Sequence, residues 1–528
     1  MKLVKILPDK IQIRTDDAEF VNARLNDLIS VSDGEVELVA MITAITDNDV
    51  ETQMDENAIM EELQQPSLKV IECSILGSVI DGEFKQQIDR YPSTDVKIHK
   101  ISDFEFGAIL AVDAVLKNSG PFQIGGYAGY DVPAYLDGNK FYQRHSCIVG
   151  NTGCGKSETV TKIVEETAKL PGANIVIFDI HGEYSRLSYV DSIKMGEVPF
   201  PIWMLGFSDM AANVLKVKED STVVVSALRK AYYEQCPNGN ENKPVYFEFE
   251  RFMAYVGRMN VENVGTGEFY KTGDKAGQEK TNKGEYNGKL SSIMNAMEAL
   301  YNDRRYNFLF PCKNEYTVSS GGKYLATFLS RIMGGDKPVK NIDLSGIPHD
   351  IAVLIIGAIT KLIYNIQIMQ KDARPITLVC DEAHVYIPTD FQLTAAQRRM
   401  VEIFENIAKE GRKFGVTLFV ASQRPSELNK TIVAQCANYI VMKLNNENDK
   451  SMIKGMMPAG SADVIETTTM FSPGDCLVVG DACPIPLKIH VELANERPQS
   501  KTIDFWDEWS KERENVDYAA CLEEYLEN

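Results

Sequence analysis

Residues 144–157 read RHSCIVGNTGCGKS, and this stretch decides the fold class. The apolar run SCIVG at 146–150 has the length and composition of a buried strand. The eight residues from Gly150 to Ser157 match the pattern GxxxxGK[ST], and the helix-like segment ETVTKIVEETAKL follows them. A strand, a glycine-rich turn and a helix in this order predict a phosphate-binding P-loop.

The P-loop residues have separate expected roles. Glycines let the backbone wrap phosphates, and the helix N-terminus favours their negative charge. We expect Lys156 to reach the outer phosphates and the Ser157 hydroxyl to bind Mg²⁺. The residues predicted to contact ATP are Gly150, Asn151, Thr152, Gly153, Cys154, Gly155, Lys156, Ser157 and Thr159.

A second apolar strand candidate, ITLVCDE at 376–382, ends in two carboxylates. An acidic pair after a strand is commonplace and by itself indicates only a solvated strand end. Beside a P-loop, such acids have specific functions, because phosphoryl transfer needs a Mg²⁺ ligand and a group that polarises the attacking water. We therefore assign Asp381 to the metal and Glu382 to catalysis.

Gln423 ends a third apolar run, VTLFVAS at 416–422. Parallel sheets bind ligands at the carboxyl ends of their strands. Gln423 is therefore a candidate for contact with the γ-phosphate or its water, and a turn residue before Pro425 is an equally good interpretation.

Arg144 and Arg412 each precede one of these strands, at the end opposite the P-loop and Gln423. Five or six residues at about 3.3 Å each separate the two strand ends by roughly 16–20 Å. Neither arginine easily reaches its own γ-phosphate over that distance. We expect both to act on the nucleotide of a neighbouring subunit, and an ordinary ion pair with a nearby carboxylate is the alternative.

The chain as a whole has the pattern of an α/β protein. Apolar runs at 146–150, 174–180, 340–346, 376–382, 416–422 and 438–444 alternate with helical stretches, which predicts a parallel sheet of the RecA/ASCE-like P-loop type. Short apolar segments before residue 120 predict a β-barrel-like domain. The expected divisions are 1–120 (barrel), 121–206 (linker and first part of the core), 207–335 (mostly helical insertion), 336–500 (second part of the core) and 501–528 (tail).

Composition limits the setting and the partners. The net charge of −20 repels nucleic acid in bulk, so DNA binding requires a local basic lining. Ten scattered cysteines without a CxxC pair favour reduced thiols in the cytoplasm. Lys361 and other polar residues interrupt the apolar run from Ile351 to Met369, which favours a helix packed on a sheet and no membrane span.

Two further segments carry polar residues. FDIHGEY at 178–184 ends a strand with Asp179, His181 and Glu183, and we interpret it as a polar loop beside the nucleotide, not as a metal site. The loop from Lys271 to Lys289 has five lysines diluted by three acids, so a solvated loop is favoured over DNA contact.

The motifs RHSCIVGNTGCGKS, FDIHGEY, LVCDEAH, EGRKFGVTLFVASQRP and FSPGDCLVVGDACPIPLKI, taken in this order, resemble the HerA family of ATPases. The resemblance covers nearly the whole chain, including the β-rich leader. Cys154 departs from it, because such loops often carry Ser or Ala at this position; the cysteine leaves the phosphate cradle intact but adds a thiol open to oxidation.

The resemblance implies a hexameric ring around double-stranded DNA, ATP-driven translocation and a partner effector. The effector would be a nuclease in end processing, or a nuclease or sirtuin-like protein in antiphage defence. Two other functions stay open. One is a nucleotide-binding ring that assembles and activates an effector without translocating, and the other is a secretion or conjugation ATPase at a membrane.

Overall fold

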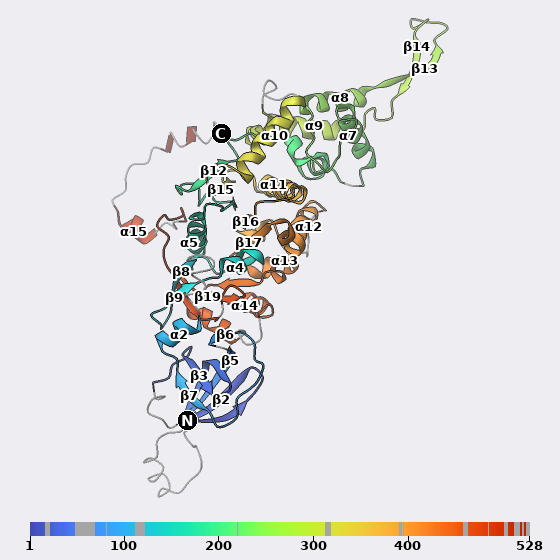
Figure 1. The fold of residues 1–528 in the computed structure, drawn as a ribbon. Coiled ribbons are helices and arrows are strands. Elements are labelled where there is room, and N and C mark those ends of the chain that lie inside the picture. Colours follow the sequence, from blue (N-terminus) through green and yellow to red (C-terminus); the bar gives the residue numbers. More distant parts are fainter. Residues whose placement is uncertain are drawn as a thin grey trace, which may run out of the picture. The chain divides into compact units, whose positions relative to one another are not determined.

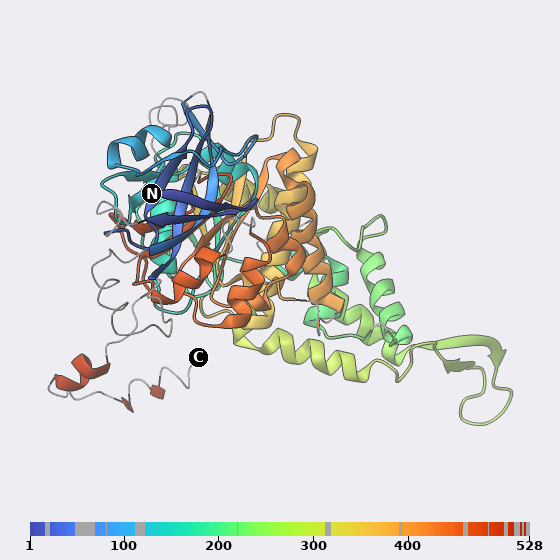
Figure 2. The same ribbon diagram turned by 90° about the horizontal axis from the view of Figure 1, so that it is seen from below.

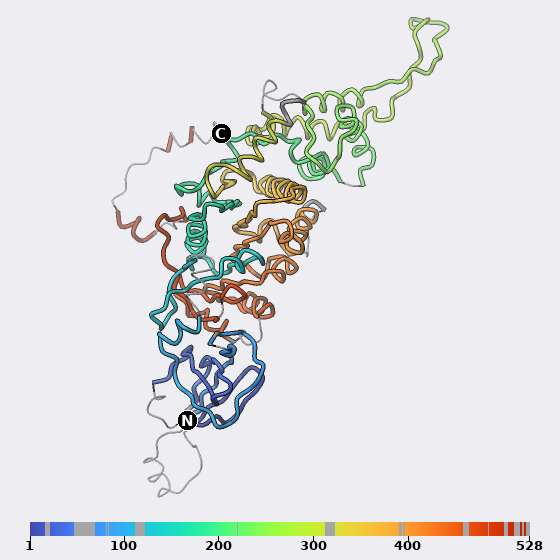
Figure 3. Tube along the Cα trace, in the orientation of Figure 1, coloured from blue at the N-terminus to red at the C-terminus, as the bar shows by residue number. Residues whose placement is uncertain are grey.

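The computed structural model describes residues 1–15, 22–47, 69–80, 82–110, 122–218, 220–311, 318–389, 393, 395–457, 463–483, 485–500, 505–511, 518–519 and 522–523. Figure 3 draws the remaining residues in grey. The chain forms two compact units. The first comprises Met1–Ile175, Pro375–Thr389 and Glu405–Pro498, and the second comprises Val176–Arg374, Asp390–Phe404 and Gln499–Asn528. Most of the expected 501–528 tail lies outside the described residues.

The first unit begins with an antiparallel sheet in the order β1-β2-β5-β4-β3-β7, with β6 paired to β5. Figure 2 shows how strongly this sheet curls. The expectation of a closed barrel is not confirmed, and a curled sheet stands in its place. Its inner face buries residues such as Ile13, Val31, Leu38 and Ile71. The strands are β1 (Lys2–Ile6), β2 (Lys10–Thr15), β3 (Leu28–Ser32), β4 (Glu37–Asp47), β5 (Lys69–Ile80), β6 (Glu83–Lys85) and β7 (Lys97–Lys100).

The first unit also carries the strands of the α/β core, in the order β16-β17-β10-β18-β19-β20-β8-β9. The pairs β16·β17, β17·β10 and β10·β18 are parallel, whereas β18, β19, β20, β8 and β9 pair antiparallel. The strands are β8 (Gln123–Tyr127), β9 (Pro133–Tyr135), β10 (Ser146–Val149), β16 (Ile376–Cys380), β17 (Val416–Ser422), β18 (Asn438–Val441), β19 (Asp475–Gly480) and β20 (Lys488–Val491).

Helices accompany these strands. The longest that lies wholly in the first unit is α5 (Lys156–Ala168), which follows β10 directly and buries Val160, Ile163 and Val164. Shorter elements are α2 (Asp103–Ile109), α4 (Gly138–Gln143), η5 (Ala383–Val385), η7 (Gly411–Phe414), η8 (Pro425–Glu427), α13 (Lys430–Ala434), α14 (Glu447–Lys454) and η10 (Asp463–Met470). Helix α12 (Ala395–Glu410) has residues in both units.

The second unit contributes three strands in the order β12-β15-β11. They are β11 (Ile175–Asp179), β12 (Val190–Lys194) and β15 (Val339–Asp343), and all five residues of β11 and of β15 are buried. The six core strands expected from the apolar runs are therefore present, and the α/β fold class is confirmed. β8, β9, β12, β19 and β20 were not expected.

Between β12 and β15 the second unit is mostly helical, as expected. Helices α7 and α8 pack together, and α8 also packs on α9. The polar loop after α8 is different from the expectation, because part of it forms a hairpin of β13 (Asn263–Phe269) and β14 (Glu279–Lys283) that projects from the helices (Figures 1 and 2). The helices are η2 (Ile202–Leu205), α6 (Phe207–Asp209), η3 (Met210–Val214), α7 (Thr222–Gln235), α8 (Phe249–Val261), α9 (Ser291–Asn302), η4 (Arg304–Leu309) and α10 (Val318–Met333).

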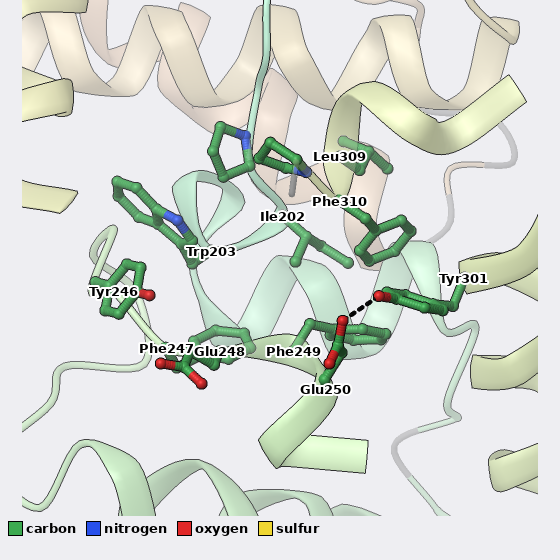
Figure 4. A pocket seen from close by; sticks show the side chains of 12 residues that line it. Ile202, Trp203, Tyr246, Phe247, Glu248, Phe249, Glu250, Tyr301, Leu309 and Phe310 are labelled. Atoms are coloured by element: carbon green, nitrogen blue, oxygen red, sulfur yellow. Dashed lines mark hydrogen bonds between the residues drawn. The ribbon is translucent and has the colours of Figure 1, made fainter. Parts of the chain in front are cut away.

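Aromatic side chains organise the interior of this helical part. Trp203, Tyr246, Phe249, Tyr301 and Phe310 line a pocket of about 70 Å³, as Figure 4 shows. The Tyr301 hydroxyl hydrogen-bonds the Glu250 carboxylate at its edge. Adjacent rings lie at angles between 22° and 68°, as in ordinary aromatic cores.

Helix α11 (His349–Met369) contains the apolar run considered above as a membrane span. Within the described part of the chain it is the one helix long and apolar enough to cross a bilayer, and 56% of its most apolar window is buried inside the protein. A buried core helix passes the same test of length and composition.

Candidate nucleotide site

The P-loop connects the carboxyl end of β10 to the start of α5. Gly155 has a φ of 95°, a left-handed conformation that side chains rarely adopt. At Gly150, an added Cβ would come within 2.6 Å of Cys154 Sγ and 2.7 Å of Met442 Cβ. The loop therefore needs glycine at both positions, once for conformation and once for space.

Helix α5 presents its N-terminus to the space inside the loop. It starts at Lys156, and no side chain caps Gly155 at its N-terminal boundary. The first amide groups of a helix have no partner within the helix and carry partial positive charge. A loop of this shape with uncapped amides fits phosphate groups.

Lys156 and Glu382 form a buried ion pair in this cradle. Lys156 Nζ lies 2.6 Å from Glu382 Oε1, and their side chains are 6% and 7% exposed. Burial raises the pKa of Glu382, but the charge and hydrogen bond of Lys156 and the hydrogen bond of Gln423 outweigh it, so the pKa is lowered overall. Glu382 is therefore a carboxylate at neutral pH.

Glu382 also has an unusual backbone. Its φ of 45° and ψ of 44° place it in the left-handed region, which costs a non-glycine residue free energy. The turn begins where β16 ends, and the Glu382 amide donates to Asp381 Oδ1 at 3.0 Å. This conformation directs the side chain toward Lys156 across the end of the sheet.

Gln423 closes the cluster from the end of β17. Its Nε2 donates to Glu382 Oε1 at 2.5 Å, and its Oε1 accepts a hydrogen bond from the Thr152 hydroxyl. One side chain thus connects the P-loop to the acidic residue at the end of β16. The prediction that Lys156, Glu382 and Gln423 lie near each other agrees with this geometry.

The reasoning from sequence missed His384. Its Nδ1 lies 3.4 Å from Glu382 Oε2 and 3.3 Å from the Ser422 hydroxyl. Burial is the largest influence on its ring and the pKa is lowered, so the neutral form is favoured. The sequence signal that could have indicated His384 is its position two residues after Glu382. A short turn there brings its side chain back to Glu382.

A metal ion and ATP fit the residues present. Among the described residues no three His, Cys, Asp or Glu side chains group together as a metal site. Mg²⁺ usually takes only one or two protein oxygens and completes its shell with phosphate and water. Ser157, in the first turn of α5, and Asp381, 3% exposed after β16, supply oxygens of this type. Glu382 Oε2 is buried without a hydrogen-bond partner among the described residues.

Cys154 and Thr159 face Met442 on β18's side of the loop. Cys154 Sγ lies 3.7 Å and Thr159 Oγ1 3.8 Å from the Met442 sulfur. Cys154 is 3% exposed, and burial raises the pKa of its thiol. The expected oxidation sensitivity is not supported, because a buried, protonated thiol is a poor target for oxidants.

Comparisons with known proteins agree with this geometry. The family model for the central domain of helicase HerA matches residues 122–363. The DNA double-strand break repair helicase HerA of Sulfurisphaera tokodaii is 23% identical over 501 residues, which cover 91% of this chain and 90% of that protein. The chain is a P-loop ATPase that is similar to HerA helicases.

Other relatives extend the comparison. A probable helicase of Methanocaldococcus jannaschii is 25% identical to this chain over 397 residues, covering 73% of this chain and 70% of that protein. The solved structure of VirB4 from Thermoanaerobacter pseudethanolicus has 14% identity and a TM-score of 0.49, covering 72% of this chain and 98% of that chain.

Arg144 and Arg412 lie at the other edge of the strands. Arg144 ends α4, and its Nη1 lies 2.7 Å from Asp481 Oδ2, with both side chains about half exposed. Arg412 is exposed in η7, before β17. Both arginines and Lys169 line a cavity of about 980 Å³. The structure thus brings the two arginines together and leaves them away from the P-loop of the same chain.

The FDIHGEY segment has a structural explanation within the second unit. The Asp179 carboxylate accepts hydrogen bonds from the amides of Gly182, Glu183 and Tyr184, and from the Asn341 side chain at 3.0 Å. Asp179 therefore stabilises the turn after β11. This agrees with a polar loop, and its position beside a nucleotide stays a prediction.

Proposed function

We propose that this chain hydrolyses ATP at the Lys156–Glu382–Gln423 cluster and uses the energy to move double-stranded DNA through a homo-hexameric ring. The observation that carries the proposal is the convergence of these three side chains at the carboxyl ends of β10, β16 and β17. Ligands of parallel α/β sheets bind at such an edge. The matches to HerA helicases support the same activity.

Each residue has a task in the hydrolysis. The P-loop amides and Lys156 bind the phosphates, and Glu382 accepts the proton of the attacking water. Lys156 and Gln423 lower the pKa of Glu382 in this structure, so the group is an ionised carboxylate, the form in which it can accept a proton. Gln423 positions the water or the γ-phosphate, since its amide already contacts Glu382. Ser157 and Asp381 would hold Mg²⁺, which neutralises phosphate charge when bound.

Binding of ATP requires an exchange of partners. Lys156 pairs with Glu382 in this structure, and the same ammonium group is needed at the outer phosphates. The triphosphate offers more negative charge than one carboxylate, so Lys156 turns to it and Glu382 is released. The carboxylate then keeps its hydrogen bond from Gln423 and is no longer paired with Lys156, so it can accept a hydrogen bond from water. This couples nucleotide binding to activation of the base.

The arginines are best explained by a neighbouring subunit. Arg144, Arg412 and Lys169 line one cavity at the edge opposite the P-loop, where Arg144 pairs with Asp481 and Lys169 pairs with Glu166. In a ring, that edge can face the nucleotide of the next subunit, where an arginine stabilises the charge of the transition state. Hydrolysis would then require assembly, as expected of a hexameric motor.

Double-stranded DNA is the proposed substrate of translocation. The net charge of −20 makes binding over the whole surface unfavourable, and a ring solves this by collecting basic groups in a channel. The S. tokodaii relative is named a DNA double-strand break repair helicase.

The eight cysteines that the structure describes are free and buried, which supports a reducing compartment such as the cytoplasm.

A nuclease or sirtuin-like effector and a role in antiphage defence complete the proposal, and both rest on the family resemblance. The second candidate function is a nucleotide-binding ring that activates such an effector without moving along DNA. It uses the same P-loop, so the two differ only in what hydrolysis accomplishes.

Steady-state ATP hydrolysis by the purified full-length chain tests the proposal. We expect duplex DNA to stimulate the rate, with the Glu382→Gln variant as the matched inactive control. A rate that ignores DNA but responds to an effector protein would favour the activating ring. A rate unchanged by Glu382→Gln would contradict the assignment of the site.

A further inference from the structure

His490 lies beside the P-loop and has no role in the hydrolysis described above. It is on β20, opposite Asp475 on β19 in the antiparallel register. The side chain is 64% exposed, yet its Nδ1 lies 2.8 Å from the Oδ1 of Asp475, whose side chain is only 6% exposed. An exposed ring is therefore held by a buried acid.

The Asp475 carboxylate that contacts His490 has two further partners. Asp475 Oδ2 lies 2.6 Å from Lys488 Nζ and accepts the Ser472 amide at 3.0 Å. Burial raises the pKa of Asp475, but the hydrogen bonds from Lys488, His490 and Ser472 lower it overall, so the group is a carboxylate. The contact with Asp475 uses Nδ1, so Nε2 is the ring nitrogen that this contact does not use.

Gly474 joins this pair to the P-loop. Its amide donates to the Cys154 carbonyl at 2.9 Å, and its backbone lies against Gly155, where an added Cβ would be 3.1 Å from the Gly474 nitrogen. On its other side, a Cβ added to Gly474 would come within 3.3 Å of His490 Cε1. The imidazole therefore packs over Gly474, the residue that contacts the loop.

The direction of a bound nucleotide follows from the sheet order. Lys156, Glu382 and Gln423 place the outer phosphates toward β16 and β17, on one side of β10. The nucleoside of an extended nucleotide then points to the other side, where β18, β19 and β20 follow β10. His490 is on that side.

We propose that His490 is a contact for the nucleoside half of the bound nucleotide, with Asp475 as its positioning residue. Nε2 accepts a hydrogen bond from an O–H or N–H group of the nucleoside. The inference rests on the proposed function, because it assumes ATP in the P-loop. It gives the FSPGDCLVV segment a task, namely to carry Gly474 against the loop and Asp475 against the ring.

Calorimetric titration of the full-length chain with two probes, ATP and inorganic tripolyphosphate, tests this. All variants carry Glu382→Gln, so that nothing is hydrolysed. His490→Ala should weaken ATP binding about five- to tenfold, the effect of one lost hydrogen bond, and leave tripolyphosphate binding unchanged. Asp475→Asn should weaken ATP binding less, and His490→Gln should restore part of it by supplying an acceptor. Leu493→Ala, also exposed and near the end of β20, is the matched control.

The outcomes separate this inference from the proposed function. Equal losses for both probes in His490→Ala would contradict a nucleoside contact, because they would indicate damage to the phosphate cradle. Unchanged ATP binding in His490→Ala, beside lost binding in Lys156→Ala, would overturn the inference and leave the proposed function standing. Unchanged ATP binding in Lys156→Ala would overturn the proposed function itself.

Discussion

Lys156 Nζ lies 2.6 Å from Glu382 Oε1. The cation proposed to bind the phosphates is thus paired with the carboxylate proposed to activate the attacking water. Glu382 reaches this position through a left-handed backbone at the end of β16. A strained residue at the centre of a site is kept when its geometry serves the site. The Lys156–Glu382 ion pair therefore couples nucleotide binding to activation of the catalytic base. Substitutions at the two residues can separate these two effects.

Glu382→Gln should bind ATP at least as tightly as the wild-type chain and lose turnover by about 100-fold or more. The amide no longer competes with the phosphates for Lys156, and it cannot accept a proton from water. Calorimetry measures the affinity, and release of phosphate measures turnover. A variant that folds normally but no longer binds ATP would show that Glu382 is structural.

Lys156→Ala should abolish nucleotide binding and also reduce the free energy of unfolding, on the order of 3 kcal/mol, because it leaves a buried carboxylate without its cation. The double variant Lys156→Ala/Glu382→Gln should recover most of this stability and none of the ATP binding. Denaturant titrations beside calorimetry distinguish the two effects. If the double variant is as unstable as the single one, the ion pair is not the cause.

Much of the site could be predicted because its residues follow strands. Gly150, Glu382 and Gln423 each come at or just after the carboxyl end of an apolar run, and parallel strands bring such ends to one edge. The α/β class followed from the same runs. Sequence patterns do not predict the hydrogen bond from Thr152 to Gln423, the one from Gln423 to Glu382, or the left-handed turn at Glu382. These depend on contacts between residues far apart in the chain.

The N-terminal sheet and the position of His490 also could not be predicted from sequence patterns. Alternating apolar residues predict strands, but closure of a barrel depends on pairing and curl that alternation does not specify. His490 and Asp475 are fifteen residues apart, and only the antiparallel register of β19 and β20 places them opposite each other. That register depends on a turn with no strong sequence signal.

His145 should make the stability of the chain pH-dependent. Its ring accepts the Leu418 amide at Nδ1 and lies 3.0 Å from the Ala408 carbonyl at Nε2, and burial lowers its pKa to about 4. The unfolded chain binds a proton near pH 6.5, whereas the folded chain does not until about pH 4. The free energy of unfolding should therefore fall as pH decreases through this window, by about 2 kcal/mol at pH 5.

Denaturant titrations at pH 7 and pH 5 check this against His145→Asn. Asparagine keeps an acceptor for the Leu418 amide, tolerates the φ of 33° at this position and does not titrate. The wild-type chain should lose about 2 kcal/mol more than the variant between the two pH values. Equal losses would show that His145 is not the titrating group.

Arg412→Ala subunits should lack ATPase activity alone and regain part of it in rings mixed with another variant. Mixed with Glu382→Gln subunits, it should recover part of the ATPase activity, because some interfaces then pair an intact Glu382 with an intact Arg412 from the neighbour. Arg144→Ala, which also loses the ion pair with Asp481, serves as a second test of the same cavity. The absence of recovery in rings shown to be mixed would mean that Arg412 acts within its own subunit or on structure alone.

Displacement of a third strand from a DNA triplex measures movement along duplex DNA. The purified full-length chain, loaded on the flanking duplex, should release the labelled third strand when ATP is added, and the Lys156→Ala chain should not. Release should also stop with Glu382→Gln, which still binds ATP. If the wild-type chain hydrolyses ATP on this DNA at the stimulated rate while the third strand stays bound, the chain is not a translocating motor.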